Sequence, residues 1–295
     1  MSSSAAPGSA CGLCGHDATP DWFQLDALTL GRCPRCKSGR VLPEAGTGHR
    51  AEDYLENYSA RYSAELDRAK ARSCWQLLVQ AVGRPSAGTR LLELGAGDGG
   101  FLDLAREHGL SAVGLEISRE AARAAAGRGH SMRVGSAEEP LPGDEQFDLI
   151  VAWDLLEHLS APRKCLVSAY EALAPGGALV IVTPYMGSVF DRLGLPLARL
   201  GIKQLARMCF SRDHVYRFDG EGLKQVLHKI GFAEISVQPI LLTSLSAERY
   251  AGGSILPSWT GVRALDRMTS RAGFALVSLL RLSNKILVVA KRGSR

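Results

Sequence analysis

Apolar segments and helical segments alternate between residues 90 and 184, and this alternation limits the fold more than any other feature of the chain. Each helical segment is long enough to cross from one strand to the next. Repeated strand–helix–strand units predict a parallel sheet that helices cover on both faces, so we expect an α/β fold. The expected strands are 90–95, 111–118, 132–137, 147–154 and 178–184, and the expected helices are 100–109, 119–129 and 161–173.

The pattern continues after residue 184 with two interruptions. A helix is expected over 219–232, and strands are expected over 233–241 and 285–292. Residues 186–212 and 242–284 interrupt the core as insertions, and we expect both to form lids over an acceptor site. In the first insertion leucine and arginine recur at helical spacing, which suits packing on the core or peripheral contact with a membrane or a lipid-linked substrate.

The N-terminus carries two cysteine pairs, CGLC at 11–14 and CPRC at 33–36. Two C-x2-C turns at this separation are typical of a zinc ribbon, in which four thiolates hold a structural Zn²⁺ and leave no open position. We therefore predict Cys11, Cys14, Cys33 and Cys36 as ligands. We expect a zinc-ribbon-like segment at 1–48, a helical linker at 49–84 and the main domain at 85–295.

The stretch LLELGAGDGG at 91–100 raises the question of cofactor type. Its glycines fit a dinucleotide fingerprint, in which backbone N–H groups face a pyrophosphate. However, the carboxylates of Glu93 and Asp98 bracket the turn and would repel phosphates. They favour a cofactor with a cationic end.

The sequence resembles class I S-adenosylmethionine-dependent methyltransferases, in particular a small-molecule subgroup related to ubiquinone-pathway methyltransferases. LLELGAGDG matches that family's first motif, and GLEIS places Glu116 where an acid accepts hydrogen bonds from the ribose. GSAEEPLPGDEQFDLIVAWDLLEHL, LAPGGALVIVTP and DHVYRFDGEGLKQVLHKIGF resemble later segments of the family. The resemblance implies a Rossmann-like, seven-stranded methyltransferase sheet.

By this resemblance the cofactor is S-adenosylmethionine. The glycine turn would pass under its methionine part, and Glu93 would meet its amino group. Serine stands at an adenine-contact position where the family often has aspartate, but its hydroxyl can still accept a hydrogen bond. The implied cofactor residues are Glu93, Gly95, Ala96, Gly97, Asp98, Gly99, Glu116, Ile117, Ser136, Ala137, Ala152, Trp153 and Asp154.

Two histidines are candidates for the catalytic chemistry. His214, in RDHVYRF, belongs to a segment that returns to the pocket in the resembled subgroup, and a neutral imidazole there could take a proton from the acceptor. The alternative is a histidine that only supports a helix end. His158, in LEHL, faces either the cofactor pocket or the core beside it.

The leading interpretation is an enzyme that methylates a small molecule, most simply at oxygen. A net charge of +5, with the basic excess in the C-terminal third, suits an anionic or lipid-linked acceptor. The alternatives are an RNA methyltransferase that uses the ribbon to hold nucleic acid, a zinc-ribbon adaptor without catalysis, and a nicotinamide enzyme. The sequence lacks the motifs of base-methylating enzymes, so nucleic acid is not the expected partner. No secretory signal or long apolar run is evident, and we expect a cytoplasmic protein.

Overall fold

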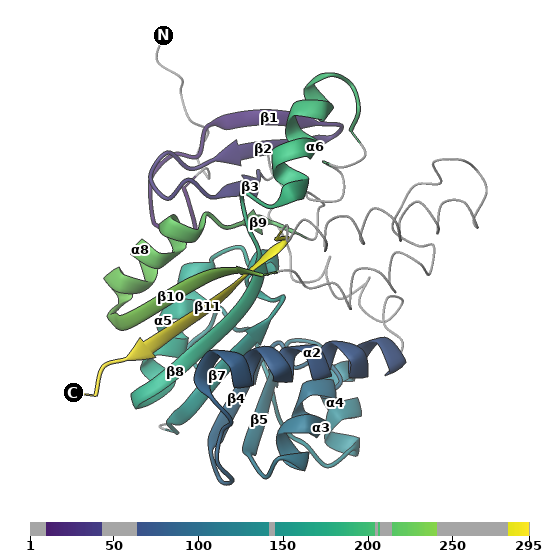
Figure 1. Ribbon diagram of the computed structural model, residues 1–295, viewed down its shortest axis with the longest axis vertical. Coiled ribbons are helices and arrows are strands. Elements are labelled where there is room, and N and C mark those ends of the chain that lie inside the picture. The colour runs from purple at the N-terminus through teal and green to yellow at the C-terminus, as the bar shows by residue number, and fades with distance from the viewer. Residues whose placement is uncertain are drawn as a thin grey trace.

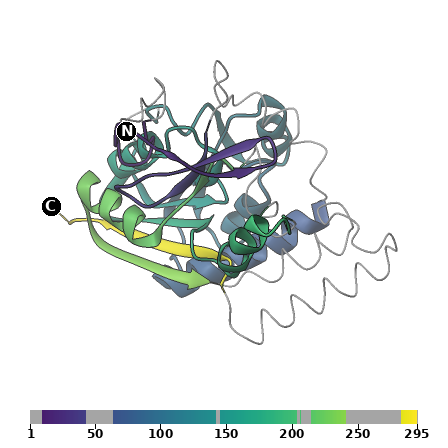
Figure 2. The same cartoon turned by 90° about the horizontal axis from the view of Figure 1, so that it is seen from above.

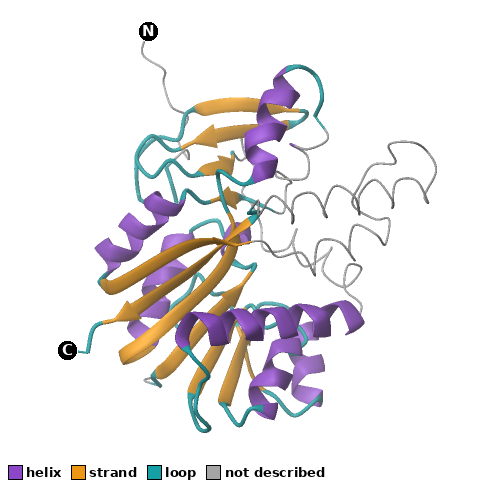
Figure 3. Cartoon of the chain, in the orientation of Figure 1, coloured by secondary structure: helices purple, strands orange, loops and turns teal. Residues whose placement is uncertain are grey.

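The computed structural model describes residues 10–42, 64–141, 145–203, 206, 214–240 and 283–294. Within these residues the strands form two sheets, a large one surrounded by helices and a small one above it (Figures 1 and 3). The small sheet lies on the side where the parallel strands of the large sheet end. Open α/β sheets bind ligands at this carboxyl edge.

The large sheet has seven strands in the order β10-β11-β8-β7-β4-β5-β6. Neighbouring strands from β8 to β6 are parallel, and β11 is antiparallel to both β8 and β10. This topology confirms the expected α/β methyltransferase sheet. The strands are β4 (Arg90–Leu94), β5 (Ser111–Glu116), β6 (Ser131–Val134), β7 (Phe147–Trp153), β8 (Leu173–Pro184), β10 (Phe232–Ile240) and β11 (Lys285–Arg292).

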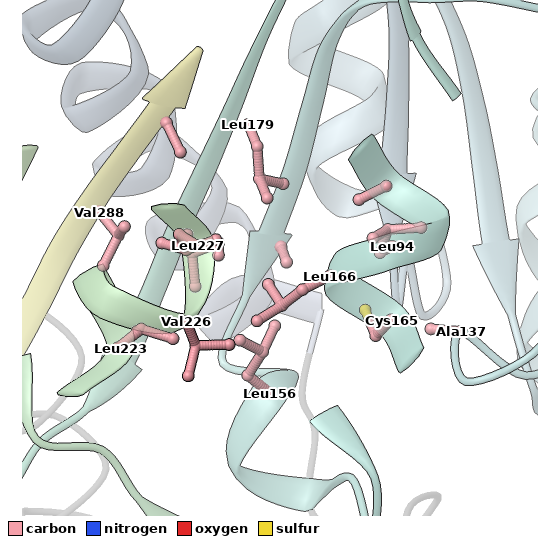
Figure 4. Packing of buried hydrophobic residues seen from close by; sticks show 14 of the residues in the cluster. Leu94, Ala137, Leu156, Cys165, Leu166, Leu179, Leu223, Val226, Leu227 and Val288 are labelled. Carbon is pink, nitrogen blue, oxygen red and sulfur yellow. The ribbon is translucent and has the colours of Figure 1, made fainter. Parts of the chain in front are cut away.

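Helices cover both faces of this sheet, which explains why its central strands are mostly apolar. Leu91 packs with α2 and α3, whereas Leu92 packs on the opposite face with α5 and α8, and both side chains are fully buried. Each such leucine contributes about 1.5–3 kcal/mol of burial free energy. Figure 4 shows the second of these cores. The helices are α2 (Ala64–Val82), α3 (Gly100–Glu107), α4 (Arg119–Gly127), α5 (Pro162–Ala172) and α8 (Gly220–Ile230).

Local signals set the helix ends. The Ser118 hydroxyl accepts a hydrogen bond from the N–H of Ala121 at 3.3 Å and begins α4. Asp219 caps α8 in the same way through the N–H of Gly222 at 2.9 Å. Side-chain acceptors at this position satisfy N–H groups that have no partner within the helix.

The small sheet is the ribbon, and it contains a strand from far along the chain. Its order is β1-β2-β3-β9, with β1 (Asp21–Leu25), β2 (Leu28–Arg32), β3 (Gly39–Val41) and β9 (Tyr216–Arg217). Helix α6 (Val189–Arg199) packs on the sheet through Leu195 and Ala198, which share an apolar cluster with Leu30. Figure 2 shows the ribbon from above, lying over the larger sheet.

Some expectations differ from the structure or lie outside it. Strand β8 begins at Leu173 instead of 178, because Leu173 already pairs with Phe147 of β7. The linker helix is seen as α2 over 64–82, and nearly all of the insertion at 242–284 lies outside the described residues. The predicted domain boundaries, and the role of both insertions as lids, stay predictions. Among the described residues, no helix is both long and apolar enough to cross a membrane.

Candidate active site and cysteine cluster

The glycine turn joins β4 to α3 at the carboxyl edge of the sheet. Gly97 and Gly99 adopt φ values of 56° and 90°, a region that favours glycine. A Cβ atom on Gly99 would also lie 2.8 Å from Cδ2 of His130. The backbone of the turn is therefore bare, as close approach of a ligand requires.

Glu116 ends β5, the neighbour of β4, and its carboxylate is held across the turn. One oxygen accepts a hydrogen bond from the N–H of Gly97 at 2.9 Å, and the other accepts from the N–H of Ser118 at 2.8 Å. Two backbone donors fix the direction of the carboxylate. The structure therefore brings this predicted ribose acceptor against the glycine turn.

Glu93 lies inside the same edge with only 4% of its surface exposed. Its Oε2 atom has no hydrogen-bond partner among the described residues. Burial raises the pKa of this carboxyl group well above its usual range, and the nearby Lys70 opposes the shift. A buried, unsatisfied carboxylate oxygen beside a bare turn fits the cationic amino group of S-adenosylmethionine.

The remaining predicted residues on this side differ in their environment. The carboxylate of Asp98 is partly exposed and lies 3.4 Å from the guanidinium of Arg128, the residue that ends α4. The Ser136 hydroxyl accepts from the N–H of Glu138 at 3.1 Å, Ala137 is buried and Ile117 is half-buried. Asp98 is therefore committed to an ion pair, while Ser136 shapes the loop expected to meet adenine.

The end of β7 supplies Ala152, Trp153 and Asp154. Ala152 is buried, and the indole N–H of Trp153 is buried with no acceptor among the described residues. Asp154 has a left-handed backbone with φ 54° and pairs with Lys285 at 2.5 Å and Lys70 at 3.4 Å. Burial raises the pKa of Asp154, but the two lysines outweigh it, so the carboxylate stays ionised.

The two candidate histidines meet at this edge. His158 ends the short helix η1 (Leu156–His158), and His214 precedes β9. Their ring centroids are 4.9 Å apart, and the rings meet edge to face at 73°. Burial, followed by the charges of His158 and Arg217, lowers the pKa of His214 to about 3. His214 is therefore neutral at physiological pH.

Glu157 completes this group. Its carboxylate is 1% exposed and accepts a hydrogen bond from the Thr183 hydroxyl at 2.9 Å. Ligand-type atoms of Glu157, His158 and His214 all lie within 4.8 Å of one another. The positive charges of Arg217 and Lys285 act on His214 and oppose its imidazolium form. For the same reason they would oppose a divalent metal ion bound at this position.

The four N-terminal cysteines form a second group, in the ribbon. The sulfurs of Cys11 and Cys36 are 3.7 Å apart, and those of Cys14 and Cys33 are 3.5 Å apart. All four sulfurs lie within 4.8 Å of one another. Zinc–sulfur bonds of about 2.3 Å place the corners of a thiolate tetrahedron about 3.8 Å apart. The donor set therefore fits Zn²⁺.

Sequence reasoning missed several residues of the site. Lys70, Lys285 and Glu157 were not singled out, although Lys285 begins a strand that pairs with the end of β8. Because that strand is antiparallel, its first residue lies at the carboxyl edge, a position that depends on strand direction. The buried pair Arg217–Asp191, 2.8 Å apart, was also missed.

Comparison with known proteins identifies the family. A family model described as a methyltransferase domain matches residues 54–237, more than half of the chain. A probable S-adenosylmethionine-dependent methyltransferase of Mycolicibacterium smegmatis is 27% identical over 55% of this chain and 65% of its own length. The mitochondrial ubiquinone biosynthesis O-methyltransferase of Mus musculus is 26% identical over 56% of this chain and 46% of its own length.

Solved structures share the fold. Phosphoethanolamine N-methyltransferase 2 of Haemonchus contortus, solved with S-adenosyl-L-methionine, has a TM-score of 0.60 at 18% identity. The match covers 86% of this chain and 62% of that one. The bare glycine turn, the two carboxylates and the matching family model together identify this chain as a member of the methyltransferase family and an S-adenosylmethionine-dependent methyltransferase.

Proposed function

We propose that this enzyme methylates a hydroxyl oxygen of a small-molecule acceptor. The observation that carries the proposal is the pair of half-buried histidines, His158 and His214, at the carboxyl edge next to the cofactor turn. Oxygen acceptors usually have to lose a proton during methyl transfer, and a neutral imidazole is a suitable base. The ubiquinone biosynthesis O-methyltransferases among the relatives support the choice of oxygen.

S-Adenosylmethionine would supply the methyl group from its sulfonium, and the chain would bind and orient it. Glu93 would accept from the amino group, and Glu116 would accept from the ribose hydroxyls. Ser136 and the N–H of Ala137 would meet the adenine. Ala152, Trp153 and Asp154 would line the methionine part, with the unsatisfied indole N–H of Trp153 as a donor.

His214 would take the acceptor proton, and His158 would orient it through the edge-to-face contact. His214 is neutral at physiological pH, which is the form that a proton acceptor requires. Burial lowers its basicity in the free enzyme, and an anionic acceptor nearby would raise it.

The exposed surface along α6 and just after it supports an acceptor with an apolar tail. Leu193 of α6 is 54% exposed, and Leu200 and Ile202, which follow the helix, are 77% and 50% exposed. The basic residues Arg192, Arg199 and Lys203 are their neighbours in the sequence. Apolar and basic side chains together suit a lipid-linked, anionic molecule or the membrane that holds it. We further propose that the protein acts in the cytoplasm with Zn²⁺ on its four N-terminal cysteines.

The first test is isothermal titration with S-adenosylmethionine, S-adenosylhomocysteine and NAD. We expect both adenosyl ligands to bind, NAD not to bind, and Glu116→Ala to weaken binding about 10- to 100-fold, since it removes hydrogen bonds to a charged acceptor. Glu120→Ala, an exposed carboxylate on α4, is the matched control. No binding of either adenosyl ligand would refute the proposed cofactor site.

The second test is methyl transfer from labelled S-adenosylmethionine to a panel of phenols, aliphatic alcohols and amines. For any acceptor found, His214→Ala should lower kcat about 10²- to 10⁴-fold, the usual range for loss of a general base. His228→Ala, an exposed histidine of α8, should retain full activity. Transfer to amines alone would contradict the oxygen assignment.

A further inference from the structure

The ribbon sheet takes its edge strand from the methyltransferase domain. In β9, Tyr216 pairs with Arg40 and Arg217 pairs with Gly39 of β3. The N–H of Val41 also donates to the carbonyl of Val215 at 2.9 Å. The backbone that immediately follows His214 is therefore held by the ribbon.

The first cysteine turn lies between β9 and the start of α5. The N–H of Gly12 donates to the Tyr216 hydroxyl at 2.9 Å, and the carbonyl of Gly12 accepts from the N–H of Arg163 at 3.2 Å. A Cβ atom on Gly12 would lie 2.4 Å from the carbonyl oxygen of Ser160. This turn therefore packs directly against the methyltransferase domain, with no room for a side chain.

The second cysteine turn packs on the start of α8. The N–H of Asp219, the cap of that helix, donates to the Ser38 hydroxyl at 3.1 Å. A Cβ atom on Gly222 would lie 1.9 Å from the carbonyl oxygen of Cys36. The two cysteine turns therefore contact the segment 214–219 at Tyr216 and at Asp219.

The same segment reaches the end of β8 on its other side. Tyr185 forms a parallel bridge with Phe218, and the N–H of Met186 donates to the carbonyl of Phe218 at 2.7 Å. The segment thus joins the ribbon to the carboxyl edge of the large sheet. His214 stands at its beginning, in contact with His158.

We infer that the ribbon is part of the acceptor site, and that Tyr216 is a positioning residue that holds His214 against His158. This inference rests on the proposed function of the two histidines. The contacts named above reach α5, β9 and α8, whereas the cofactor carboxylates Glu93 and Glu116 belong to β4 and β5. Loosening the ribbon therefore moves His214 and leaves S-adenosylhomocysteine binding intact.

The experiment uses the full-length, zinc-loaded protein and the variant Tyr216→Phe. Removing the hydroxyl deletes the hydrogen bond from the N–H of Gly12 at 2.9 Å and the longer one from the Arg40 guanidinium at 3.4 Å, while the ring remains. The matched control is Tyr170→Phe, whose ring packs on Phe232 away from the histidines. Measurements are zinc content, S-adenosylhomocysteine affinity, the imidazole NMR signals of His158 and His214, and amide hydrogen exchange over 215–218. His158→Ala and His214→Ala assign the signals.

In Tyr216→Phe we expect unchanged zinc content, an S-adenosylhomocysteine affinity within about twofold of wild type, and displaced His214 signals. Amide exchange over 215–218 should be about tenfold faster, which corresponds to about 1.4 kcal/mol for the hydrogen bonding lost at the hydroxyl. His214 signals and exchange rates that match the Tyr170→Phe control would overturn the inference. If Tyr216→Phe loses zinc, the variant Ser38→Ala replaces it, because it removes the hydrogen bond between the second cysteine turn and Asp219. The His214 signals and exchange rates of Ser38→Ala are then compared with the same control. If the wild-type protein itself does not bind S-adenosylhomocysteine, the proposed function is refuted instead.

Discussion

Asp154 and Lys285 form an ion pair of 2.5 Å between the end of β7 and the start of β11, and Lys70 of α2 reaches the same carboxylate at 3.4 Å. Three elements thus meet on one side chain at the edge of the sheet. Both partners of the shorter pair have less than a fifth of their side-chain surface exposed. The pair therefore links the last strand to the site.

Lys285→Met should destabilise the protein at pH 7. We expect the free energy of unfolding to fall by more than the ~1 kcal/mol of a surface ion pair and less than the ~3–5 kcal/mol of a fully buried one. The loss should stay below the buried value because Lys70 still pairs with Asp154. The folded-state pKa of Asp154 is lowered, so the pair's contribution is present at neutral pH. It should be lost as the pH falls below about 4, the ordinary pKa of aspartate.

Urea unfolding at several pH values measures this effect. Lys291→Met on the same strand is the control, since its pair with Glu234 is exposed. An equal loss for both variants would contradict a special role for Lys285.

Glu93→Gln should stabilise the ligand-free protein and weaken S-adenosylmethionine binding. The folded-state pKa of Glu93 is raised, so ionisation at neutral pH opposes folding, and the amide removes this cost. We expect a rise in Tm of about 2–4 °C for each kcal/mol regained. Affinity should fall about tenfold with the loss of the charged acceptor.

The proton linkage gives a second readout for Glu93. A bound ammonium group favours the carboxylate, so wild type should release protons on binding below the free-protein pKa of Glu93, and affinity should rise with pH. Titrations in two buffers of different ionisation enthalpy measure the released protons. Release that persists in Glu93→Gln, or disappears in the exposed control Glu107→Gln, would argue against this carboxylate.

Asp191→Asn should destabilise the contact between α6 and β9. Arg217 donates to the Asp191 carboxylate at 2.8 Å and to the Ser188 hydroxyl at 3.0 Å, and both charged side chains are buried. Leaving a buried guanidinium with a weakened partner costs up to about 3–5 kcal/mol. The double variant Asp191→Leu/Arg217→Met should recover part of this loss, as measured by urea unfolding. A double variant no more stable than Asp191→Asn would contradict this account.

Cys33→Ser should abolish zinc binding. Purified wild type should contain about one Zn²⁺ per chain, because four thiolates close the coordination sphere. Mass spectrometry of the metal content, with the buried Cys74→Ala as control, checks this. Loss of zinc should also lower Tm, since metal binding is coupled to folding of the ribbon. Unchanged metal content in Cys33→Ser would contradict the predicted ligand set.

The sequence alone was enough for the fold and for the position of the glycine turn. Strand–helix alternation predicted the parallel sheet, and β11 begins and ends at the residues expected. The cysteine spacing predicted a cluster that the structure confirms in geometry. These features depend on local patterns, because neighbouring residues determine them. A run of apolar residues indicates burial on both faces, glycines give the backbone freedom to turn, and short C-x2-C spacings indicate a metal site.

Only the tertiary structure decided what surrounds the histidines. His158 and His214 lie far apart in sequence and meet because β9 leaves the large sheet's domain to complete the ribbon. Lys285 reaches Asp154 only because β11 runs antiparallel beside β8. Such contacts depend on strand order and direction, which are set by packing over the whole sheet, and no local pattern in the sequence specifies them.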